Sequence, residues 1–433
     1  MTYLPKPFSD EWWSEFLRET QHLSAPAAFA KAIAPDRVAF LRQSVLNVVA
    51  TLCTLRTARY GFRAYADGRL MDRDEMEWIY DHPPLPGEGL QAWAQRVFRD
   101  RKFGFIINSG EKFDEAFSQD IALAMAPLLR QAGIPRDGIQ FTLFIGNYDK
   151  TPLGIHQDNR GESVTHFHVG PGRKVMYVWD KEDYRRLTHE GGLKPRDFQA
   201  LQPHARKFTI ESGDLFYMPE GTYHIGVQDE LSIGITVWQY THTNTDMAWA
   251  MLRHVGTQIR PIDGDAIVHD TMPPDVDSHI DSIVAPHTVP LEYRHLTFEA
   301  LLKTAYVDWR HILFSNAGYR NRPFERTQRE AFSREDEVQL EAPYKILTRR
   351  MAGTGKMIVY VRGHRLELND HPCLVDFIER LNDGEVHAVP ELLGLLDKRW
   401  SDKVGLHLLS EIHLYRGLVK RQAAPAKVEV EAA

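Results

Sequence analysis

The chain has 433 residues, more than one hydrophobic core usually organises, so we expect two or three domains. A content of 43% hydrophobic and 26% charged residues is typical of a soluble globular protein, and the net charge of −7 argues against non-specific nucleic-acid binding as the main activity. The two cysteines, Cys53 and Cys373, lie in apolar helix-like stretches, which indicates reduced thiols in a cytoplasmic protein rather than a disulfide framework.

Residues 1–100 are predicted to form a helical N-terminal extension. Segment 8–20 has the pattern of an amphipathic helix capped by Ser9 or Asp10, and a longer helix with a broad apolar stripe follows Pro35. Apolar stripes of this kind usually pack into a core, so we expect the extension to pack on the next domain. The N-terminus lacks a basic region followed by an apolar run, and no stretch approaches ~20 uninterrupted apolar residues, so neither a secretory signal nor a membrane span is expected.

Residues 101–243 are predicted to form the central domain. Lys102–Asn108 reads as its first strand, and Ser109 is expected to cap a helix that Gly133 and Pro135 close. Short strands separated by Gly, Pro and Asp then follow at 139–147, 152–158, 164–169, 173–180, 206–210, 214–218, 222–228 and 231–240. This run predicts an α+β protein built on a double-sheet jelly roll, the double-stranded β-helix. The charged piece 181–204 is expected to form a helix and loop at the mouth of the barrel.

Residues 244–335 are predicted to be a linker and a helical region. Asp246–Arg260 looks helical, and a polar stretch that starts at Pro261 and contains four further prolines is the best linker candidate. Two helices are expected to follow it, the first of them running through Phe298 and Trp309.

Residues 336–421 are predicted to form a separate winged-helix-like domain. Lys356–Leu368 has the pattern of a hairpin that turns at Arg362-Gly363. Helices are expected at 371–382, 389–398 and 404–416, with a return strand at 417–419. The small, polar tail 422–433 is expected to be disordered.

His156 and Asp158 are the first candidate site residues. They lie two apart on a predicted strand, so both side chains point to the same face. His224, near the end of the segment Gly213–His224, adds a third ligand, and two histidines with one carboxylate form the facial triad of non-haem Fe(II) sites. A structural alternative is a half-buried histidine bonded to Asp158. The ordered combination of this pair, a Gly-x-Gly hairpin and the distal histidine favours the metal site.

Three segments, Gly154–Asp158, Gly170–Lys174 and Gly213–His224, resemble the JmjC/cupin family of Fe(II)- and 2-oxoglutarate-dependent oxygenases. The resemblance is strongest to the bacterial ribosomal oxygenases, which are protein side-chain hydroxylases with a C-terminal winged helix. It implies that His156, Asp158 and His224 bind iron and that Lys174 holds the outer carboxylate of 2-oxoglutarate, while dioxygen is the other cosubstrate. The run between the HxD motif and the hairpin is longer here than in the family, and His168 replaces a common glutamine.

Several side chains near these motifs have alternative interpretations. Lys174 is favoured over Arg173 as the inward cation, because Arg173 would share a face with aromatic residues. Arg160, His166 and His168 are expected at the barrel mouth, where they contact substrate or are solvated loop residues. His166 and His168 as additional metal ligands are disfavoured, since three ligands already leave the open positions that the reaction requires.

These observations predict an oxygenase that hydroxylates a side chain of a protein or peptide, either a ribosomal protein or a precursor peptide. The alternatives are a small-molecule or amino-acid hydroxylase of the same family and a non-catalytic metal-binding cupin adaptor. The resemblance implies a homodimer, and neither a nucleic acid nor a membrane is expected as a partner. The C-terminal unit, with few cations in Val404–Arg416, is predicted to bind polypeptide through a hairpin edge or to pack on the barrel.

Overall fold

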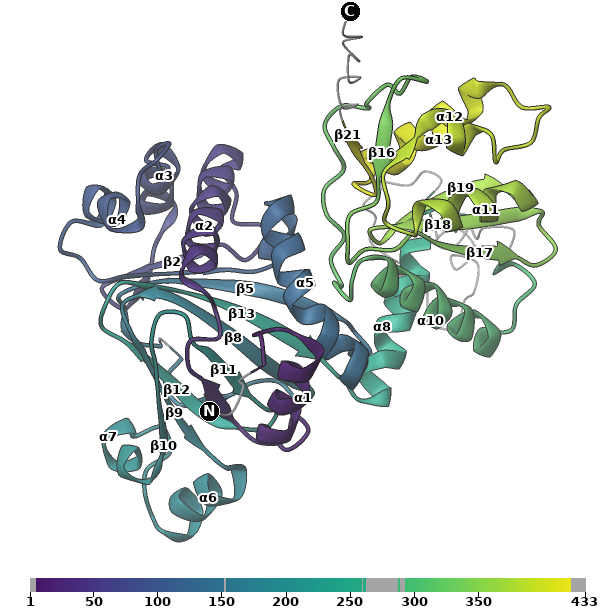
Figure 1. The fold of residues 1–433 in the computed structure, drawn as a ribbon. Helices are drawn as coiled ribbons and strands as arrows, with labels where there is room; N and C mark the ends of the chain where they lie inside the picture. The colour runs from purple at the N-terminus through teal and green to yellow at the C-terminus, as the bar shows by residue number, and fades with distance from the viewer. Residues whose placement is uncertain (1–4, 152, 259, 262–286, 289–292, 422–433) are drawn as a thin grey trace, which may run out of the picture. The chain divides into compact units, whose positions relative to one another are not determined.

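The computed structural model describes residues 5–151, 153–258, 260–261, 287–288 and 293–421. The chain divides into two compact units. Unit 1 consists of Met1–His242, Asn316–Thr327 and Glu341–Pro343. Unit 2 consists of Thr243–Ser315, Gln328–Leu340 and Tyr344–Ala433. Both units combine helices with antiparallel sheets (Figure 1), as expected for the predicted mixed class.

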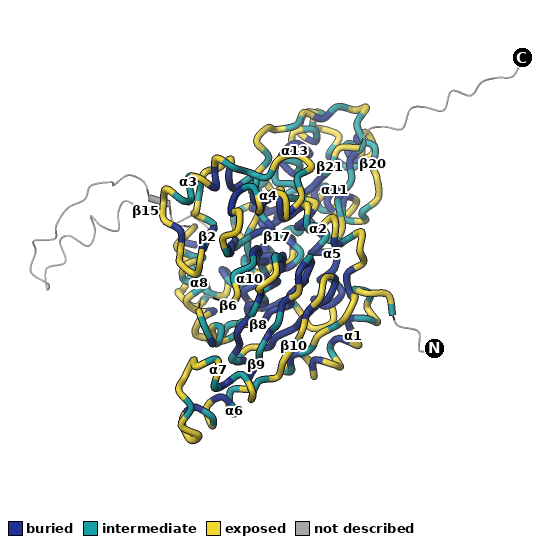
Figure 2. The backbone as a smooth tube through the Cα atoms, turned by 90° about the vertical axis from the view of Figure 1, so that its left-hand side faces the viewer, coloured by how far each residue is buried: buried dark blue, intermediate teal, exposed yellow. Residues whose placement is uncertain are grey.

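The larger sheet of unit 1 has eight antiparallel strands in the order β1-β11-β8-β13-β5-β4-β2-β3. Its central strands are rich in β-branched and aromatic residues, which suit a pleated, two-sided buried surface. β8 accordingly appears mostly dark blue in Figure 2. The strand bounds are β1 (Ala27–Phe29), β2 (Arg63–Ala66), β3 (Arg69–Leu70), β4 (Phe103–Ile107), β5 (Ile139–Gly146), β8 (Glu162–Pro171), β11 (Leu215–Met218) and β13 (Ser232–Tyr240).

The second sheet of unit 1 has five strands in the order β10-β9-β12-β6, with β7 also paired to β12. Its bounds are β6 (Asp149–Lys150), β7 (His156–Gln157), β9 (Lys174–Trp179), β10 (Arg206–Ile210) and β12 (Tyr223–Gln228). A cluster of buried apolar side chains joins this sheet to the larger one, with three members from each: Val164, Phe216 and Met218 from the larger sheet, and Met176, Val178 and Ile210 from the smaller. The two sheets therefore share one core.

Helices lie against the large sheet of unit 1 (Figure 1). Phe117 of α5 packs on Phe141 of β5 with ring centroids 4.7 Å apart. The Trp13 indole of α1 donates to the carbonyl of Ala124 in α5 over 2.8 Å, so the N-terminal helix is fixed to α5. The helix bounds are α1 (Asp10–Glu19), α2 (Pro35–Leu55), α3 (Arg73–Asp81), α4 (Leu90–Phe98), α5 (Glu115–Ala132), α6 (Lys181–Arg185) and α7 (Phe198–Leu201).

Among the described helices, α2 is long and apolar enough to cross a membrane when length and composition alone are considered. Half of its most apolar window is buried inside the protein, and the core helix of a soluble protein passes the same test. α2 contacts β8, and the Arg42 guanidinium donates to the carbonyl of Val169. These contacts make α2 part of the packing of unit 1.

Three predicted features of unit 1 differ in the structure. Residues 1–100 are not purely helical, because β1, β2 and β3 join the large sheet, where β1 pairs with β11 and β2 with β4. α5 is capped by Asp114, whose carboxylate accepts from the Phe117 amide, whereas Ser109 has a left-handed backbone and precedes a short 3-10 turn. The strand expected at 152–158 is reduced to β7, because Gly154 turns the chain with a positive φ of 66° just before it.

Unit 2 begins with two helices, α8 (Asn244–Gln258) and α10 (Phe298–Ser315), which pack through Met247, Met251 and Ala305. Asp308 of α10 is 1% exposed and accepts hydrogen bonds from the His254 imidazole, over 2.7 Å, and from the Tyr360 hydroxyl. This buried carboxylate therefore links both helices to the sheet that follows.

The hairpin expected at 356–368 is present as β18 (Lys356–Val361) and β19 (His364–Asn369), and β17 (Leu347–Met351) adds a third strand. A second small sheet has the order β20-β16-β21. Its strands are β16 (Glu337–Gln339), β20 (His387–Ala388) and β21 (Val419–Arg421), and the helices of this part are α11 (Pro372–Leu381), α12 (Val389–Leu393) and α13 (Asp402–Leu414). One apolar cluster, including Val359, Phe377 and Leu409, forms their shared core.

Two predictions lie largely or wholly outside the described residues. The proline-rich linker that starts at Pro261 falls mainly in segments 262–286 and 289–292, which lie outside the described residues. The described residues next to these segments form a short strand pair, β14 (Arg260–Pro261) and β15 (His287–Thr288). The tail 422–433, which was expected to be disordered, is also outside them.

Candidate metal centre and cosubstrate pocket

A cavity of about 470 Å³ lies in unit 1 and is lined by strands of both sheets. Its wall includes His156, Asp158, His224 and Lys174, four residues that the sequence predicted as site residues. His224 and Lys174 are 7% exposed, whereas Leu153 on the same wall is 63% exposed. The cavity is therefore deep and opens to the surface on one side.

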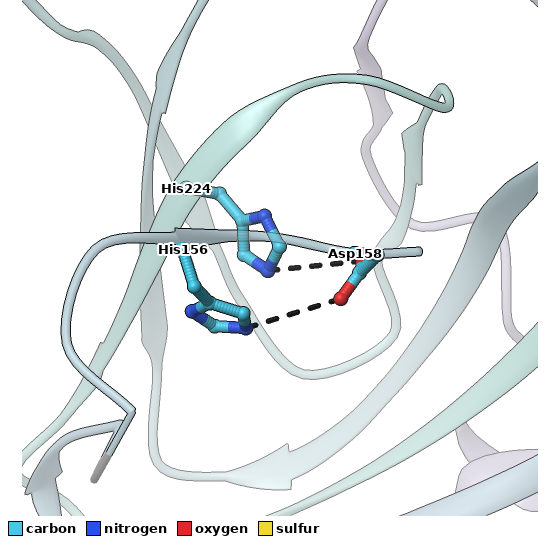
Figure 3. A group of neighbouring side chains, drawn as sticks. All are labelled: His156, Asp158 and His224. Carbon is cyan, nitrogen blue, oxygen red and sulfur yellow. Dashed lines mark ion pairs between the residues drawn. The ribbon is translucent and has the colours of Figure 1, made fainter. Parts of the chain in front are cut away.

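The metal-ligand candidates are brought together by strand pairing. His156 of β7 lies directly opposite His224 of β12, so the two imidazoles project from the same face of the sheet. Asp158 follows two residues after His156 and points to that face as well. Figure 3 shows the three side chains converging, with the two histidine rings 4.3 Å apart at their centroids.

The distances between the ligand atoms describe a compact site. Each Nε2 lies 3.9 Å from an oxygen of Asp158, with His156 facing Oδ1 and His224 facing Oδ2. All three ligand atoms lie within 4.8 Å of one another. Two imidazole nitrogens and one carboxylate oxygen at this separation can bind one divalent ion while leaving further coordination positions open.

Backbone carbonyls fix the orientation of both imidazole rings. The His156 Nδ1 lies 2.9 Å from the Gly154 carbonyl oxygen, and the His224 Nδ1 lies 3.2 Å from that of Thr222. A carbonyl can only accept, so Nδ1 carries the proton in each ring and Nε2 keeps its lone pair toward Asp158. This outer arrangement is the one that metal-binding histidines use.

Burial also favours a cation at this position. It lowers the pKa of His156, and together with the neighbouring His156 ring it lowers the pKa of His224 to about 3, so both imidazoles are neutral ligands at physiological pH. Burial, with a smaller contribution from Glu162, raises the pKa of Asp158 to about 7. A divalent cation would reverse that cost by pairing with the carboxylate. The donor set, the ring orientations and the charge requirement all fit a metal ion.

The direction of the Lys174 side chain follows from the same alternation of side chains along a strand. His224 is opposite Val178 in the pairing of β12 with β9, and Lys174 lies four residues before Val178, so its side chain also points to the cavity. Its ammonium nitrogen is 3.4 Å from the Tyr148 hydroxyl and 5.2 Å from the centroid of the Phe144 ring. No ion pair of the described residues includes Lys174. A buried ammonium that is outside every described ion pair is suited to a bound anion.

Arg173, the alternative inward cation, is on the surface. Its side chain is 53% exposed and its Nε lies 3.7 Å from a carboxylate oxygen of Glu230. Of the two basic residues, Lys174 is therefore the one that reaches the cavity.

His166 and His168 are not the solvated loop residues that one of their two interpretations expected. They lie in β8, which contains the strand predicted at 164–169, and are 5% and 0% exposed. His166 lines the cavity, and His168, which is bonded through Nε2 to the Gly172 carbonyl, is not on the cavity wall. Arg160 is exposed and does not line the cavity.

Some cavity residues were missed by the sequence analysis. Tyr148 lies just after β5, and Gly104 of β4 makes room for it, since a Cβ on Gly104 would come within 2.9 Å of the ring. Arg63 and Tyr65 reach the cavity from β2. Only the pairing of distant strands brings these residues to the site, and no local pattern marks them.

Comparisons with known proteins find similarity at the level of structure. No protein-family model matches the chain, and no curated protein matches its sequence. Among solved structures, the ribosomal oxygenase YcfD from Escherichia coli is 14% identical with a TM-score of 0.49, covering 94% of this chain and 98% of its own. YcfD in complex with cobalt and succinic acid is 15% identical with a TM-score of 0.47. YcfD in complex with cobalt and 2-oxoglutarate is 14% identical with a TM-score of 0.46.

The identities are below 25% and the TM-scores below 0.5, so the chemistry of the site rests on its own residues.

Proposed function

We propose that this protein is an Fe(II)- and 2-oxoglutarate-dependent oxygenase, built on a double-stranded β-helix, that hydroxylates a side chain of a protein or peptide. One observation carries the proposal. His156, Asp158 and His224 converge at one cavity whose wall also contains a buried lysine outside every described ion pair. This reaction class requires three metal ligands of this type and a basic side chain that binds the cosubstrate.

The triad would hold the iron through the two Nε2 atoms and the Asp158 carboxylate. Bound iron and 2-oxoglutarate together supply the activation of dioxygen. The carbonyls of Gly154 and Thr222 hold the imidazole rings in place, so the ligand atoms need little rearrangement on loading. Lys174 binds the distal carboxylate of 2-oxoglutarate, and the Tyr148 hydroxyl, 3.4 Å from its ammonium, is placed to assist.

The shape of the cavity supports a substrate that enters only in part. A volume of about 470 Å³ is within the ordinary range of small-molecule sites, so a folded partner would stay outside and insert one side chain. Arg63, Leu153 and Asn159 line the cavity and are exposed, which gives a polypeptide a surface to lie on. We propose that the substrate is a ribosomal protein or a precursor peptide.

The second unit is proposed to bind polypeptide rather than nucleic acid. Five cations are spread over its hairpin region and interleaved with acids, and in the structure each has a partner: Arg349 and Arg365 with Asp308, Arg350 with Asp370, Lys356 with Glu367, and Arg362 over the Tyr344 ring. α13, which contains most of the segment 404–416, buries Leu408, Leu409 and Ile412 in the core. These five cations are therefore not free to neutralise phosphates. The homodimer and the cytoplasmic location stay predictions.

Turnover with defined substrates tests the proposal. Purified protein, Fe(II) and 2-oxoglutarate are incubated with ribosomal proteins or precursor peptides, and succinate and the oxidised polypeptide are measured by mass spectrometry. We expect succinate formation that rises with the polypeptide and one added oxygen on a single side chain. Turnover with free amino acids instead would favour the small-molecule alternative, and metal binding without any 2-oxoglutarate binding would favour the adaptor.

A further inference from the structure

His166 has an unsatisfied hydrogen-bonding atom at the cavity. The side chain lines the cavity wall and the residue is 5% exposed. Its Nδ1 is bonded to the Thr236 hydroxyl over 2.8 Å, whereas its Nε2 is buried and has no hydrogen-bond partner among the described residues. Leaving a buried polar atom unpaired is costly, so an unpaired ring nitrogen on a residue that lines a cavity points to a bound group that pairs with it.

A glycine gives the His166 ring its place. Gly234 of β13 lies beneath the imidazole, and a Cβ on Gly234 would come within 2.1 Å of Cε1 and 2.7 Å of Nε2. Any larger residue at this position would push the ring away. The close approach therefore depends on the absence of a side chain at Gly234.

The same glycine locates His166 relative to Lys174. Gly234 pairs with Phe144 of β5, and the Lys174 ammonium lies 5.2 Å from the centroid of the Phe144 ring. His166 and Lys174 thus lie at the same end of the cavity. The Tyr148 hydroxyl, which is 3.4 Å from the ammonium, belongs to this end as well.

The protonation of His166 suits an anion. Burial, with Lys174 as the next cause, lowers the pKa of His166 well below its ordinary value, so the ring is neutral. The Thr236 hydroxyl can donate to Nδ1, which leaves the proton of the neutral ring on Nε2. The cavity end then offers one cation and one neutral imidazole donor, which together complement a single carboxylate.

We propose that His166 is a specificity-determining residue for the cosubstrate, whose Nε2–H donates to the distal carboxylate of 2-oxoglutarate beside Lys174. This inference rests on the proposed function. The subsite selects a 2-oxo acid that ends in a carboxylate over one of similar length that ends in a methyl or an amide group, because neither can satisfy the lysine and the imidazole together.

Equilibrium binding tests the assignment without requiring turnover. Calorimetric titration of 2-oxoglutarate into the Fe(II)-loaded protein under anaerobic conditions compares the wild type with His166→Leu and His166→Gln. We expect His166→Leu to raise Kd roughly tenfold or more, as the loss of a hydrogen bond to a charged group implies, and to reduce the preference over the methyl-ended 2-oxo acid. His166→Gln keeps a donor and should retain part of the affinity.

A second variant reaches the same atom indirectly. Gly234→Ala should displace the imidazole and weaken 2-oxoglutarate binding as His166→Leu does, while the iron content is unchanged. Gly89→Ala, where a Cβ would meet nothing within 4 Å, is the matched glycine control. His168→Gln, on the same strand but off the cavity wall, is the matched histidine control and should bind 2-oxoglutarate normally.

The outcomes separate the two proposals. If the wild type binds 2-oxoglutarate but His166→Leu and Gly234→Ala bind it equally well, the role of His166 is wrong and the proposed function stands. If the iron-loaded wild type does not bind 2-oxoglutarate, the proposed function itself fails.

Discussion

Replacing Lys174 by methionine removes the buried ammonium from the cavity while keeping most of the length of the side chain. In the proposed complex this ammonium pairs with the distal carboxylate of 2-oxoglutarate, and a hydrogen bond to a charged group contributes about 1.5–3 kcal/mol. At about 1.4 kcal/mol per factor of ten, Kd for 2-oxoglutarate should rise roughly 10- to 150-fold. Anaerobic calorimetry on the iron-loaded protein measures this directly.

Two further readouts make the Lys174 prediction specific. No described ion pair includes Lys174, so the variant should bind iron like the wild type and its unfolding midpoint should not fall. Arg173→Met is the matched control, because Arg173 is 53% exposed and faces Glu230, and it should leave Kd unchanged. Equal affinity of Lys174→Met and wild type for 2-oxoglutarate would refute the assignment of the anchor.

Alanine at any of the three triad residues should abolish stoichiometric iron binding with the fold intact, as metal analysis and circular dichroism would show; full iron content in one variant removes that residue from the site. Burial raises the pKa of Glu111 from 4.5 to about 7, so the folded protein keeps a proton that the unfolded chain loses, and stability should fall by up to ~3 kcal/mol between about pH 4.5 and pH 7. Urea unfolding across this range should show a fall in the wild type that is smaller in Glu111→Gln by about this amount. Asp308→Asn leaves Arg349 and Arg365 without their buried carboxylate and should destabilise unit 2 by about 3 kcal/mol, whereas Asp370→Asn should cost less than 1 kcal/mol in the same assay.

The site could be predicted from the sequence to the extent that strand alternation determines it. His156 and Asp158 share a face because they are two apart, and Lys174 points inward for the same reason as Met176 and Val178. His224 lies opposite His156 because β12 pairs with β7. A sequence motif can suggest that the two histidines meet, but only the register of the two strands shows it.

The remaining features depend on contacts between distant segments. β1, β2 and β3 are too short to show a period, so residues 1–100 were read as helical. The strand predicted at 164–169 contains His166, but its pattern does not show that the ring is buried, because Gly234, which accommodates the ring, lies 68 residues further along the chain. Ser109 has a side chain that could cap a helix, but its backbone is left-handed and its side chain makes no capping hydrogen bond. Asp114 caps α5 instead.

The central claim is that one cavity binds iron through the triad and 2-oxoglutarate beside it. The direct measurement is 2-oxoglutarate binding by the same purified protein, under anaerobic conditions, before and after loading with Fe(II). The account predicts one iron per chain and 2-oxoglutarate affinity that increases strongly with the metal, since the cosubstrate would contact both the iron and Lys174. Stoichiometric iron with no 2-oxoglutarate binding, or binding that is the same with and without iron, would contradict it.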